Sequence, residues 1–412
     1  MSGKKRKPVI NTHCHLINLN FVPDKMTKLL SGIPENIADD EWFGVAVGIL
    51  VKLKPGSNFK RIKKFLEDFR GSIDQVTDNY VKEMRKAGID ICVPLMMDLE
   101  QAAPNPGDIN TPYYDDAGDS QIELISRQVA RYPWQIFPFV MFDPRRPNGD
   151  NICIEALKKM GFIGVKMYPP LGYHPSWRVM EKSDPNAAER LKKLYKYCGT
   201  HHVPITTHAS TGGAYSTSMD KDREKDAWPL TEVSNWLEPI RTYKLKINFA
   251  HFGGNYLDEK DNKRVQSSTW FREIKNLIAI SQKKTGFGSV YTDLSYHDMA
   301  LNKKKIKRNY FDNLRKNLSD RNYSSRILFG TDASMISHTW SEKNYITPFT
   351  NKKNLNTKMQ KLIFSDNPTS FLFHNTQIPN SYIRFLKAKR GNKPFLQLPD
   401  WIKKLRGKYY IV

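Results

Sequence analysis

The sequence is poor in cysteine and has no long apolar run. Its four cysteines form no Cys-x-x-Cys pair, which argues against a disulfide-stapled secreted domain and favours a reducing compartment. The longest apolar run, residues 42–51, is far shorter than the roughly 20 residues that span a bilayer. No hydrophobic segment of a signal peptide follows the basic residues 1–7. We therefore expect a soluble, cytoplasmic protein with no membrane partner.

Acidic residues are also scarce relative to basic ones. The chain has 65 Lys and Arg against 42 Asp and Glu, a formal net charge of +23. Such an excess can indicate an anionic partner, either nucleic acid or an acidic small molecule. The basic residues are spread along the whole chain, and no nucleic-acid-binding motif accompanies them. A lysine-rich solvated surface is therefore the favoured interpretation, and nucleic acid is not an expected partner.

What the sequence does have is a repeated alternation of short apolar runs and helical patterns. With 412 residues, 39% of them hydrophobic, it can form a single large barrel with insertions. Eight apolar runs have the length of buried strands. They are residues 7–13, 89–97, 136–142, 164–168, 203–208, 246–251, 290–294 and 326–331.

Helical patterns lie between these runs. Residues 73–86, 187–198 and 230–242 carry apolar side chains at helical spacing, and Asp184 or Asn186 could cap the second. Eight strands alternating with helices predict an α/β fold of the (β/α)8 TIM-barrel class. We expect the barrel to occupy residues 1–374 and a basic C-terminal extension to occupy residues 375–412.

Residues 18–72 are too many for a simple loop after the first strand. Residues 42–51 read as a buried helix or strand and residues 59–69 as a basic amphipathic helix. We expect this helical insertion to form a lid or a subunit contact, so a homodimer is a candidate assembly. The polar loop 212–226 follows a predicted strand and could also cover the mouth of the barrel.

The first strand ends in the sequence Asn11-Thr12-His13-Cys14-His15. Side chains alternate between the two faces of a strand, so His13 and His15 point the same way. Two imidazoles on one face can bind a single metal ion. Taken alone, the pair could equally be two incidental histidines at a strand end.

Three further polar residues follow apolar strands. His208 ends the fifth predicted strand, His251 the sixth, and Asp332 follows the eighth. Catalytic residues of barrel enzymes lie at these carboxyl ends, and imidazole nitrogen with carboxylate oxygen forms a normal divalent metal site. The alternative for each residue is a buried side chain satisfied by hydrogen bonds, but their common position favours a metal centre.

These motifs resemble a known family. Segments 11–15, 246–254 and 328–332 are similar to strands one, six and eight of the amidohydrolase superfamily. They are most similar to the branch that contains aminocarboxymuconate semialdehyde decarboxylase and related hydrolases. Residues 366–372 resemble the start of that branch's final helix, so the resemblance covers residues 7 to about 374.

The resemblance implies a divalent metal held by His13, His15, His208 and Asp332. Zn2+ is the leading candidate, Mn2+ and Fe2+ are alternatives, and there could be one ion or two. His251 would bind a second metal or act on the substrate, and Asp332 would accept a proton from the activated water. Lys166, at the end of the fourth predicted strand, would bridge two metals if carboxylated or bind a substrate carboxylate if charged.

Other polar residues follow the third and fourth predicted strands. Arg145, Tyr168 and Arg178, together with Lys166, are candidate substrate-binding residues, since a guanidinium suits a carboxylate. Arg145 and Arg178 could equally be surface arginines in loops, and Lys166 could reach the barrel rim. We expect a small, anionic substrate.

Three functions remain open at this point. The first is a metal-dependent hydrolase of an amide-type C–N or lactone-type C–O bond, with Asp332 and His251 as catalytic residues. The second is a non-oxidative decarboxylase of an aromatic or unsaturated acid, which would use the same ligands. The third is an inactive basic barrel that binds nucleic acid, which the intact set of ligands argues against.

Overall fold

The computed structural model describes residues 7–22, 69–102, 109–210, 227–254, 265–302, 304–337, 340–396 and 398–404. The segments 42–51 and 212–226 lie outside the described residues. So does most of the predicted insertion 18–72, including all but the last residue of the expected helix 59–69.

All eight predicted strands are present, and every pairing between them is parallel. Each strand is short and almost wholly buried, as expected for a parallel sheet covered by helices. They are β1 (Ile10–Cys14), β2 (Ile91–Pro94), β3 (Phe139–Met141), β4 (Gly164–Met167), β5 (Pro204–Thr207), β6 (Lys246–Phe249), β7 (Ser289–Asp293) and β8 (Ile327–Leu328).

Backbone contacts close the strands into a barrel. β3 to β8 form one continuous sheet, and β1 pairs with β2. Parallel bridges from Cys92 to Ile136 and from Leu95 to Phe139 join β2 to β3. On the other side, the amide of Thr12 donates to the carbonyl of Phe329 at 2.9 Å, next to β8. The strands therefore follow one another around a closed (β/α)8 barrel.

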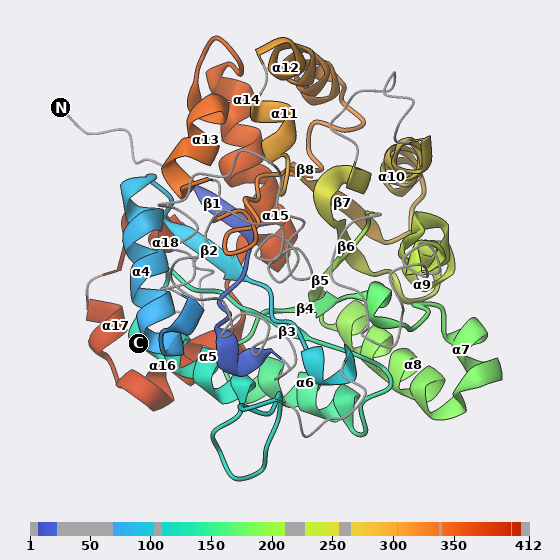
Figure 1. Cartoon of the computed structure of the whole chain (residues 1–412), viewed down its shortest axis with the longest axis vertical. Helices are drawn as coiled ribbons and strands as arrows, with labels where there is room; N and C mark the ends of the chain where they lie inside the picture. The colour runs from blue at the N-terminus through green and yellow to red at the C-terminus, as the bar shows by residue number, and fades with distance from the viewer. Residues whose placement is uncertain are drawn as a thin grey trace, which may run out of the picture.

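Helices surround the strands, as Figure 1 shows. The predicted helix 73–86 is α4, which begins with a capping box between Ser72 and Gln75. Asp184 caps α8 by accepting from the amide of Ala187 at 2.9 Å. The helices through β8 are α4 (Ile73–Lys86), α5 (Gln121–Arg131), α6 (Gly149–Lys159), α7 (Trp177–Ser183), α8 (Pro185–Thr200), α9 (Leu237–Tyr243), α10 (Val265–Lys283), α11 (Asp298–Asn302) and α12 (Lys304–Ser319). After β8 come α13 (Glu342–Thr350), α14 (Thr357–Lys361), α15 (Asn367–Leu372), α16 (Asn380–Arg390), α17 (Lys393–Leu396) and α18 (Asp400–Lys404).

Two predicted elements differ from those observed. The helix expected over 230–242 is interrupted, because Glu232 has an extended backbone between two short 3-10 turns, and α9 begins only at Leu237. The eighth strand, expected to reach residue 331, ends at Leu328. Beyond it, the amide of Phe329 donates to the carbonyl of Ile363 instead of to a neighbouring strand.

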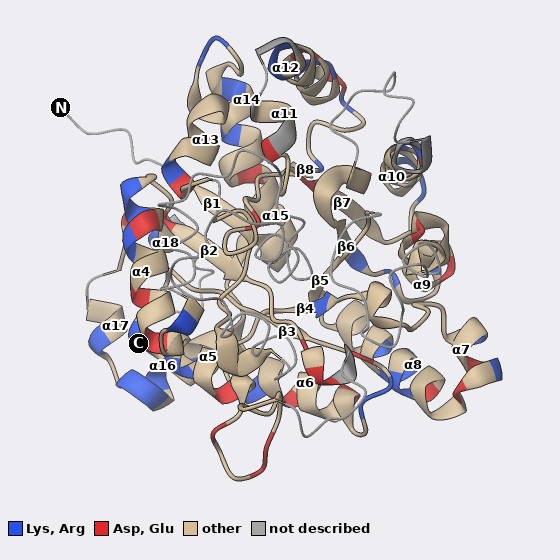
Figure 2. Cartoon of the chain, viewed as in Figure 1, with Lys and Arg blue, Asp and Glu red and all other residues tan. Residues whose placement is uncertain are grey.

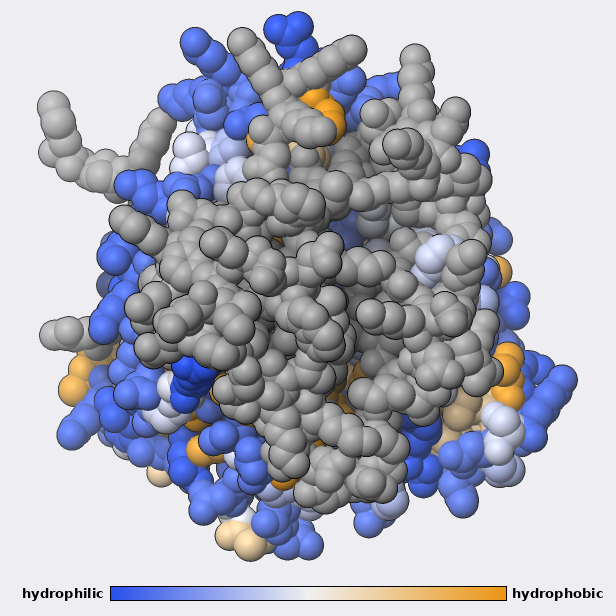
Figure 3. Space-filling model, viewed as in Figure 1, coloured by the Kyte–Doolittle hydropathy of each residue, from blue (hydrophilic) through white to orange (hydrophobic). Residues whose placement is uncertain are grey.

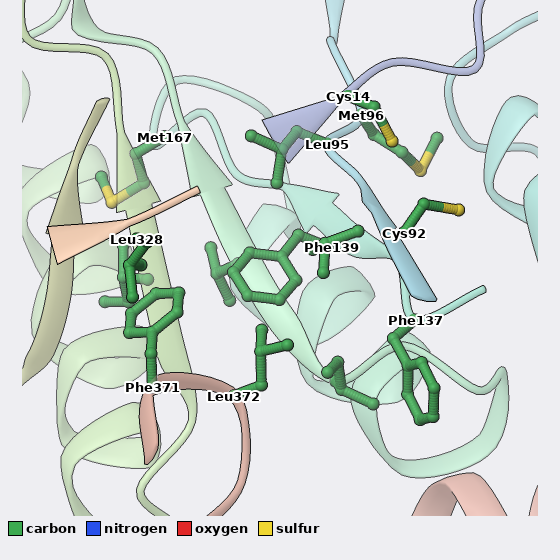
Figure 4. Close-up of a cluster of buried hydrophobic side chains, with 14 of the residues drawn as sticks. Cys14, Cys92, Leu95, Met96, Phe137, Phe139, Met167, Leu328, Phe371 and Leu372 are labelled. Atoms are coloured by element: carbon green, nitrogen blue, oxygen red, sulfur yellow. The ribbon is translucent and has the colours of Figure 1, made fainter. Parts of the chain in front are cut away.

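Buried hydrophobic side chains, among them Phe139 and Phe371, pack together in the core of the barrel (Figure 4). The ring of Phe371, from α15, lies 6.2 Å from that of Phe139 on β3 and 5.2 Å from that of Tyr291 on β7. β3 and β7 are on opposite sides of an eight-stranded barrel, so Phe371 spans its interior. A Cβ atom at Gly164 would lie 2.4 Å from the Phe139 ring, which explains the glycine at the start of β4.

The C-terminal extension packs on the outside of the barrel. α16 contacts α5 and α6. Its Tyr382 ring stacks on that of Phe137, with centroids 4.5 Å apart. The Tyr382 hydroxyl accepts from the amide of Trp134 and donates to the carbonyl of Ile136. These contacts explain why a helix forms in a segment whose role the sequence leaves open.

Basic residues lie on most of the outer helices and are mixed with acidic ones (Figure 2). On the face in Figure 3, the described surface is mainly hydrophilic with scattered apolar residues. No helix among the described residues is both long and apolar enough to cross a membrane.

Candidate metal centre

β1 and the residue that follows it place His13 and His15 at the carboxyl end of the barrel. His13 and His15 are 1% and 5% exposed. The Nδ1 atom of His15 lies 2.7 Å from the carbonyl oxygen of Leu95, and that of His13 lies 3.1 Å from Oδ2 of Asp293. Because a carbonyl oxygen only accepts, His15 must carry its proton on Nδ1. Its Nε2 atom then presents a lone pair whenever the ring is neutral.

Asp332 faces both imidazoles. Its Oδ1 atom lies 3.3 Å from Nε2 of His13 and 3.1 Å from Nε2 of His15. Oδ1 is buried and makes no aligned hydrogen bond with any described residue. Although burial by itself would raise the pKa of Asp332, the two imidazoles lower it well below its ordinary value. The carboxylate is therefore ionised.

This geometry fits a bound cation. Burial lowers the pKa of His15 and favours its neutral form, so the Nε2 lone pair of His15 faces a carboxylate oxygen. Two electron pairs directed at each other repel unless a positive ion lies between them. The remaining nitrogens are held by Leu95 and Asp293, the kind of hydrogen bonding that orients metal-binding histidines. The residues present thus suit a divalent metal.

His251 belongs to the same cluster. One potential ligand atom from each of His13, His251 and Asp332 lies within 4.8 Å of the others. Burial lowers the pKa of His251 to about 3, so its ring is neutral. Its Nε2 atom lies 3.2 Å from Nδ1 of His208, whose Nε2 in turn lies 3.0 Å from the hydroxyl oxygen of Ser210. His208 therefore reaches the cluster beside His251.

The backbone is in the left-handed region at two of these residues. His251 and Asp332 have φ angles of 63° and 62°, a conformation that non-glycine residues seldom adopt. The amide of Asp332 donates to the carbonyl of His13 at 2.8 Å, and that of His251 donates to Oδ1 of Asp293 at 3.2 Å. Backbone strain of this kind concentrates at functional sites, and here it turns both side chains toward the same point.

Lys166 lies on β4 and is only 1% exposed. Burial lowers its pKa to about 8, although Asp332 and Asp293 act in the opposite direction. Its Nζ atom lies 5.5 Å from the centre of the Tyr168 ring, which is itself 4.6 Å from the ring of His208. Lys166 and Tyr168 thus stand beside the histidine cluster.

The two predicted arginines have other partners. Arg145 is paired with Asp143, with Nη2 and Oδ2 2.7 Å apart. Arg178 is 69% exposed on its side chain and pairs with Glu238 of α9. These aspartate and glutamate partners already neutralise the guanidinium groups. A substrate-binding role for either arginine stays a prediction.

The residues that hold the histidines in place are not among the predicted metal ligands or catalytic residues, although the end of the seventh predicted strand places Asp293 where it could line the site. Asp293 is fully buried at the end of β7 and also accepts from Nδ2 of Asn248 at 2.7 Å. The hydroxyl oxygen of Ser295 lies 3.0 Å from Nδ1 of His13 and 2.9 Å from Nδ1 of His251. The position of Asp293 at a strand end was a usable signal, whereas nothing in the sequence distinguished Ser295 or Asn248.

A family model described as Amidohydrolase matches residues 10–373. The chain belongs to the amidohydrolase family. Its motifs, its barrel and its buried cluster of histidines and aspartates agree with that membership, and this amidohydrolase is accordingly an enzyme. Among curated proteins, no sequence matches it.

Two solved structures share the fold of this amidohydrolase. One is 5-carboxyvanillate decarboxylase from Novosphingobium aromaticivorans with bound manganese and 3-methoxy-4-hydroxy-5-nitrobenzoic acid. It is 11% identical, with a TM-score of 0.52 over 90% of this chain and 99% of that chain. The other is a probable 2-pyrone-4,6-dicarboxylic acid hydrolase from Acinetobacter baumannii with bound citric acid. It is also 11% identical, with a TM-score of 0.51 over 88% of this chain and 98% of that chain.

Proposed function

We propose that this amidohydrolase is a metal-dependent hydrolase that cleaves a C–N or C–O bond of a small, carboxylate-bearing substrate. The observation that carries the proposal is the buried Oδ1 atom of Asp332, which faces the Nε2 atoms of His13 and His15 without an aligned hydrogen bond. His13, His15, His208 and Asp332 would hold a divalent metal, with His251 beside them. Such an ion polarises an oxygen of the substrate and makes water more acidic.

The chain's own residues supply the remaining steps. Asp332 accepts a proton from the attacking water, since its Oδ1 atom is not engaged by another donor. Asp332 then passes this proton to the leaving nitrogen or oxygen. His251, neutral because burial lowers its pKa to about 3, orients the substrate by hydrogen bonding. Proton transfer by positioned groups of this kind contributes about 100- to 10,000-fold to a rate.

Lys166 gives the substrate preference in this proposal. With its pKa at about 8 it is mainly an ammonium ion at neutral pH, and it lies beside the cluster where it can bind a carboxylate. The two solved structures described above hold a nitrobenzoic acid and citric acid, respectively, which agrees with a carboxylate-bearing substrate. A lysine that binds the carboxylate equally serves a decarboxylase, which is the second candidate function.

Product analysis tests the reaction. The purified enzyme would be analysed for bound metal, stripped with a chelator and reloaded separately with Zn2+, Mn2+ or Fe2+. It would then be assayed on carboxylated lactones, cyclic amides and aromatic acids in water labelled with heavy oxygen. Hydrolysis places the heavy oxygen in the organic product. Release of carbon dioxide, with no label in the organic product, would identify a decarboxylase.

Asp332→Asn is the matching variant, because it keeps the size of the side chain and removes its charge. We expect it to lose metal-dependent turnover while the far-UV circular dichroism stays unchanged. Asp119→Asn, at an exposed aspartate, is the control and should behave like the unmodified enzyme. Full turnover in Asp332→Asn would overturn the proposal for either reaction.

A further inference from the structure

A groove of about 680 Å³ opens at the end of the barrel opposite to the histidine cluster. Phe162 and Ile163 line it just before β4, and Pro204 lines it at the first residue of β5. Lys166 and His208 lie at the other ends of the same two strands. Because a strand rises about 3.3 Å per residue, the four residues from Pro204 to His208 separate the groove from the cluster by roughly 13 Å. Barrel enzymes catalyse at the carboxyl ends, so this groove is not the active site.

The groove is basic. It is lined by cationic residues and imidazoles, namely Lys158, Lys159, Arg384, His201, His202 and His374. Lys159 is paired with Glu155, at 3.0 Å. Lys158 and Arg384 form no ion pair with any residue in the described ranges, and no aspartate or glutamate of those ranges lines the groove. Two cations are therefore available to an external anion.

Flat rings also line the groove. The imidazoles of His202 and His374 stack with centroids 3.8 Å apart and planes 8° apart. The Nζ atom of Lys158 lies over the Tyr197 ring, 5.5 Å from its centre. Burial, together with the positive charge of Lys246, lowers the pKa of both stacked histidines. The rings are thus neutral surfaces in a region of positive potential.

The backbone around the stacked pair is unusual. His202, Asn375 and Thr376 have φ angles of 54°, 51° and 58°, in the left-handed region that side chains other than glycine disfavour. A backbone of this kind persists only where the surrounding packing holds it. We infer that packing holds both the loop after α8, which contains His202, and the loop after α15, which contains Asn375 and Thr376. The C-terminal extension contributes Arg384 from α16, so it completes a wall of the groove.

We propose that this groove binds a phosphorylated aromatic ligand of the mononucleotide class. Lys158 and Arg384 bind the phosphate, and the rings of His202, His374 and Tyr197 contact the base. The volume lies within the range of pockets for small molecules. A concave pocket of this size favours a mononucleotide over a long polynucleotide, which would need an extended basic surface.

Calorimetric titration of the full-length enzyme with AMP tests the proposal, with inorganic phosphate, adenosine and a single-stranded oligoadenylate as comparison ligands. We expect saturable one-to-one binding of AMP that is tighter than that of phosphate or adenosine. Arg384→Glu and Lys158→Glu should each weaken it by about tenfold or more, because each removes a charge-assisted contact and adds a repulsive one. Both side chains are exposed, so the variants should fold normally.

Two controls locate the binding. Arg390→Glu makes the same charge change on α16 at a residue that does not line the groove, and it should leave AMP affinity unchanged. His13→Ala alters the metal centre and should also leave it unchanged. The proposal is overturned if AMP shows no saturable binding, if either control weakens it as much as Arg384→Glu does, or if phosphate binds as tightly as AMP. Tighter binding of oligoadenylate that also depends on Arg390 would identify a polynucleotide surface instead.

Discussion

Asp293 holds His13 from behind, with its Oδ2 atom 3.1 Å from Nδ1 of His13, while Nε2 of the same ring lies 3.3 Å from Oδ1 of Asp332. His13 therefore lies between two buried carboxylates. Burial opposes the ionised form of Asp293, but the imidazole of His13 lowers its pKa below the ordinary value. The same two aspartates raise the pKa of His13 despite its burial. Asp293 thus fixes the ring so that Nε2 points into the proposed metal centre.

Asp293→Asn tests this positioning. The amide keeps the size of the side chain but removes the charge that orients His13, so we expect metal affinity to fall by about 10- to 100-fold. Competition with a chromophoric chelator would measure the change. Asp119→Asn, at the exposed aspartate used above, should leave the affinity unaltered. An unchanged affinity in Asp293→Asn would show that His13 needs no such support.

Gly330→Ala should disturb the same histidine through its Cβ atom. An added Cβ would lie 2.7 Å from Cβ of His13 and 3.1 Å from Cβ of Ser295. Because Cβ of His13 is fixed by β1, we expect metal affinity to fall, together with a loss of about 1–3 kcal/mol in the free energy of unfolding.

Gly88→Ala is the control for backbone strain. Gly88 has a φ of +74° and nothing within 4 Å of an added Cβ, so this variant should lose stability without losing metal. Equal metal affinities in Gly330→Ala and the unmodified enzyme would contradict the predicted displacement of His13.

Glu342 should make stability depend on pH. Burial raises its pKa to about 7, although Thr331 and Asn11 donate to its carboxyl oxygens at 2.9 and 3.4 Å. The folded protein therefore keeps this proton more strongly than the unfolded chain, whose glutamate pKa is about 4.3. The stability contributed by Glu342 is complete below the unfolded value and is lost as pH rises to about 7. The loss is at most roughly 4 kcal/mol.

Glu342→Gln isolates this effect, because glutamine does not titrate. Relative to the unmodified enzyme, the variant should become more stable as pH is raised from 5 to 8, as measured by urea unfolding in the presence of a chelator. Glu155→Gln, at an exposed glutamate whose side chain is 47% accessible, should show no comparable trend. A constant difference between Glu342→Gln and the unmodified enzyme would mean that Glu342 is ionised throughout this range.

Tyr382→Phe tests whether the C-terminal extension belongs to the folded barrel. The variant keeps the ring that stacks on Phe137 but loses the bonds of the hydroxyl to Trp134 and Ile136. We expect a loss of about 1–3 kcal/mol in the free energy of unfolding, since buried backbone groups lose partners. Thermal unfolding in a single transition would confirm that α16 unfolds with the barrel. A separate early transition in the unmodified enzyme would contradict it.

The pattern of the sequence predicted the barrel and the place of the cluster. Short apolar runs between helical patterns located all eight strands, and the alternation of side chains placed His13 and His15 on one face of β1. His251 and Asp332 follow strands six and eight, and parallel strands bring their carboxyl ends to one end of a barrel. These features are local in the chain, which is why they can be read without coordinates.

Contacts between distant residues could not be predicted in this way. Asp293 reaches His13 across 280 positions in the chain, and the pairing of Arg178 with Glu238 depends on how α7 lies beside α9. The early end of β8 likewise results from Phe329 bonding to Ile363. In each case the residue could bond to several partners, and the packing of the folded chain determines which partner lies within reach.

The sequence by itself thus determined which residue types stand at the ends of the strands, since strand period and apolar runs are properties of neighbouring residues. Only the tertiary structure decided which of their atoms face each other, which arginines are already neutralised, and how far burial lowers the pKa of Lys166. The physical reason is that hydrogen bonding and desolvation depend on distances between side chains, and the folded chain sets these distances.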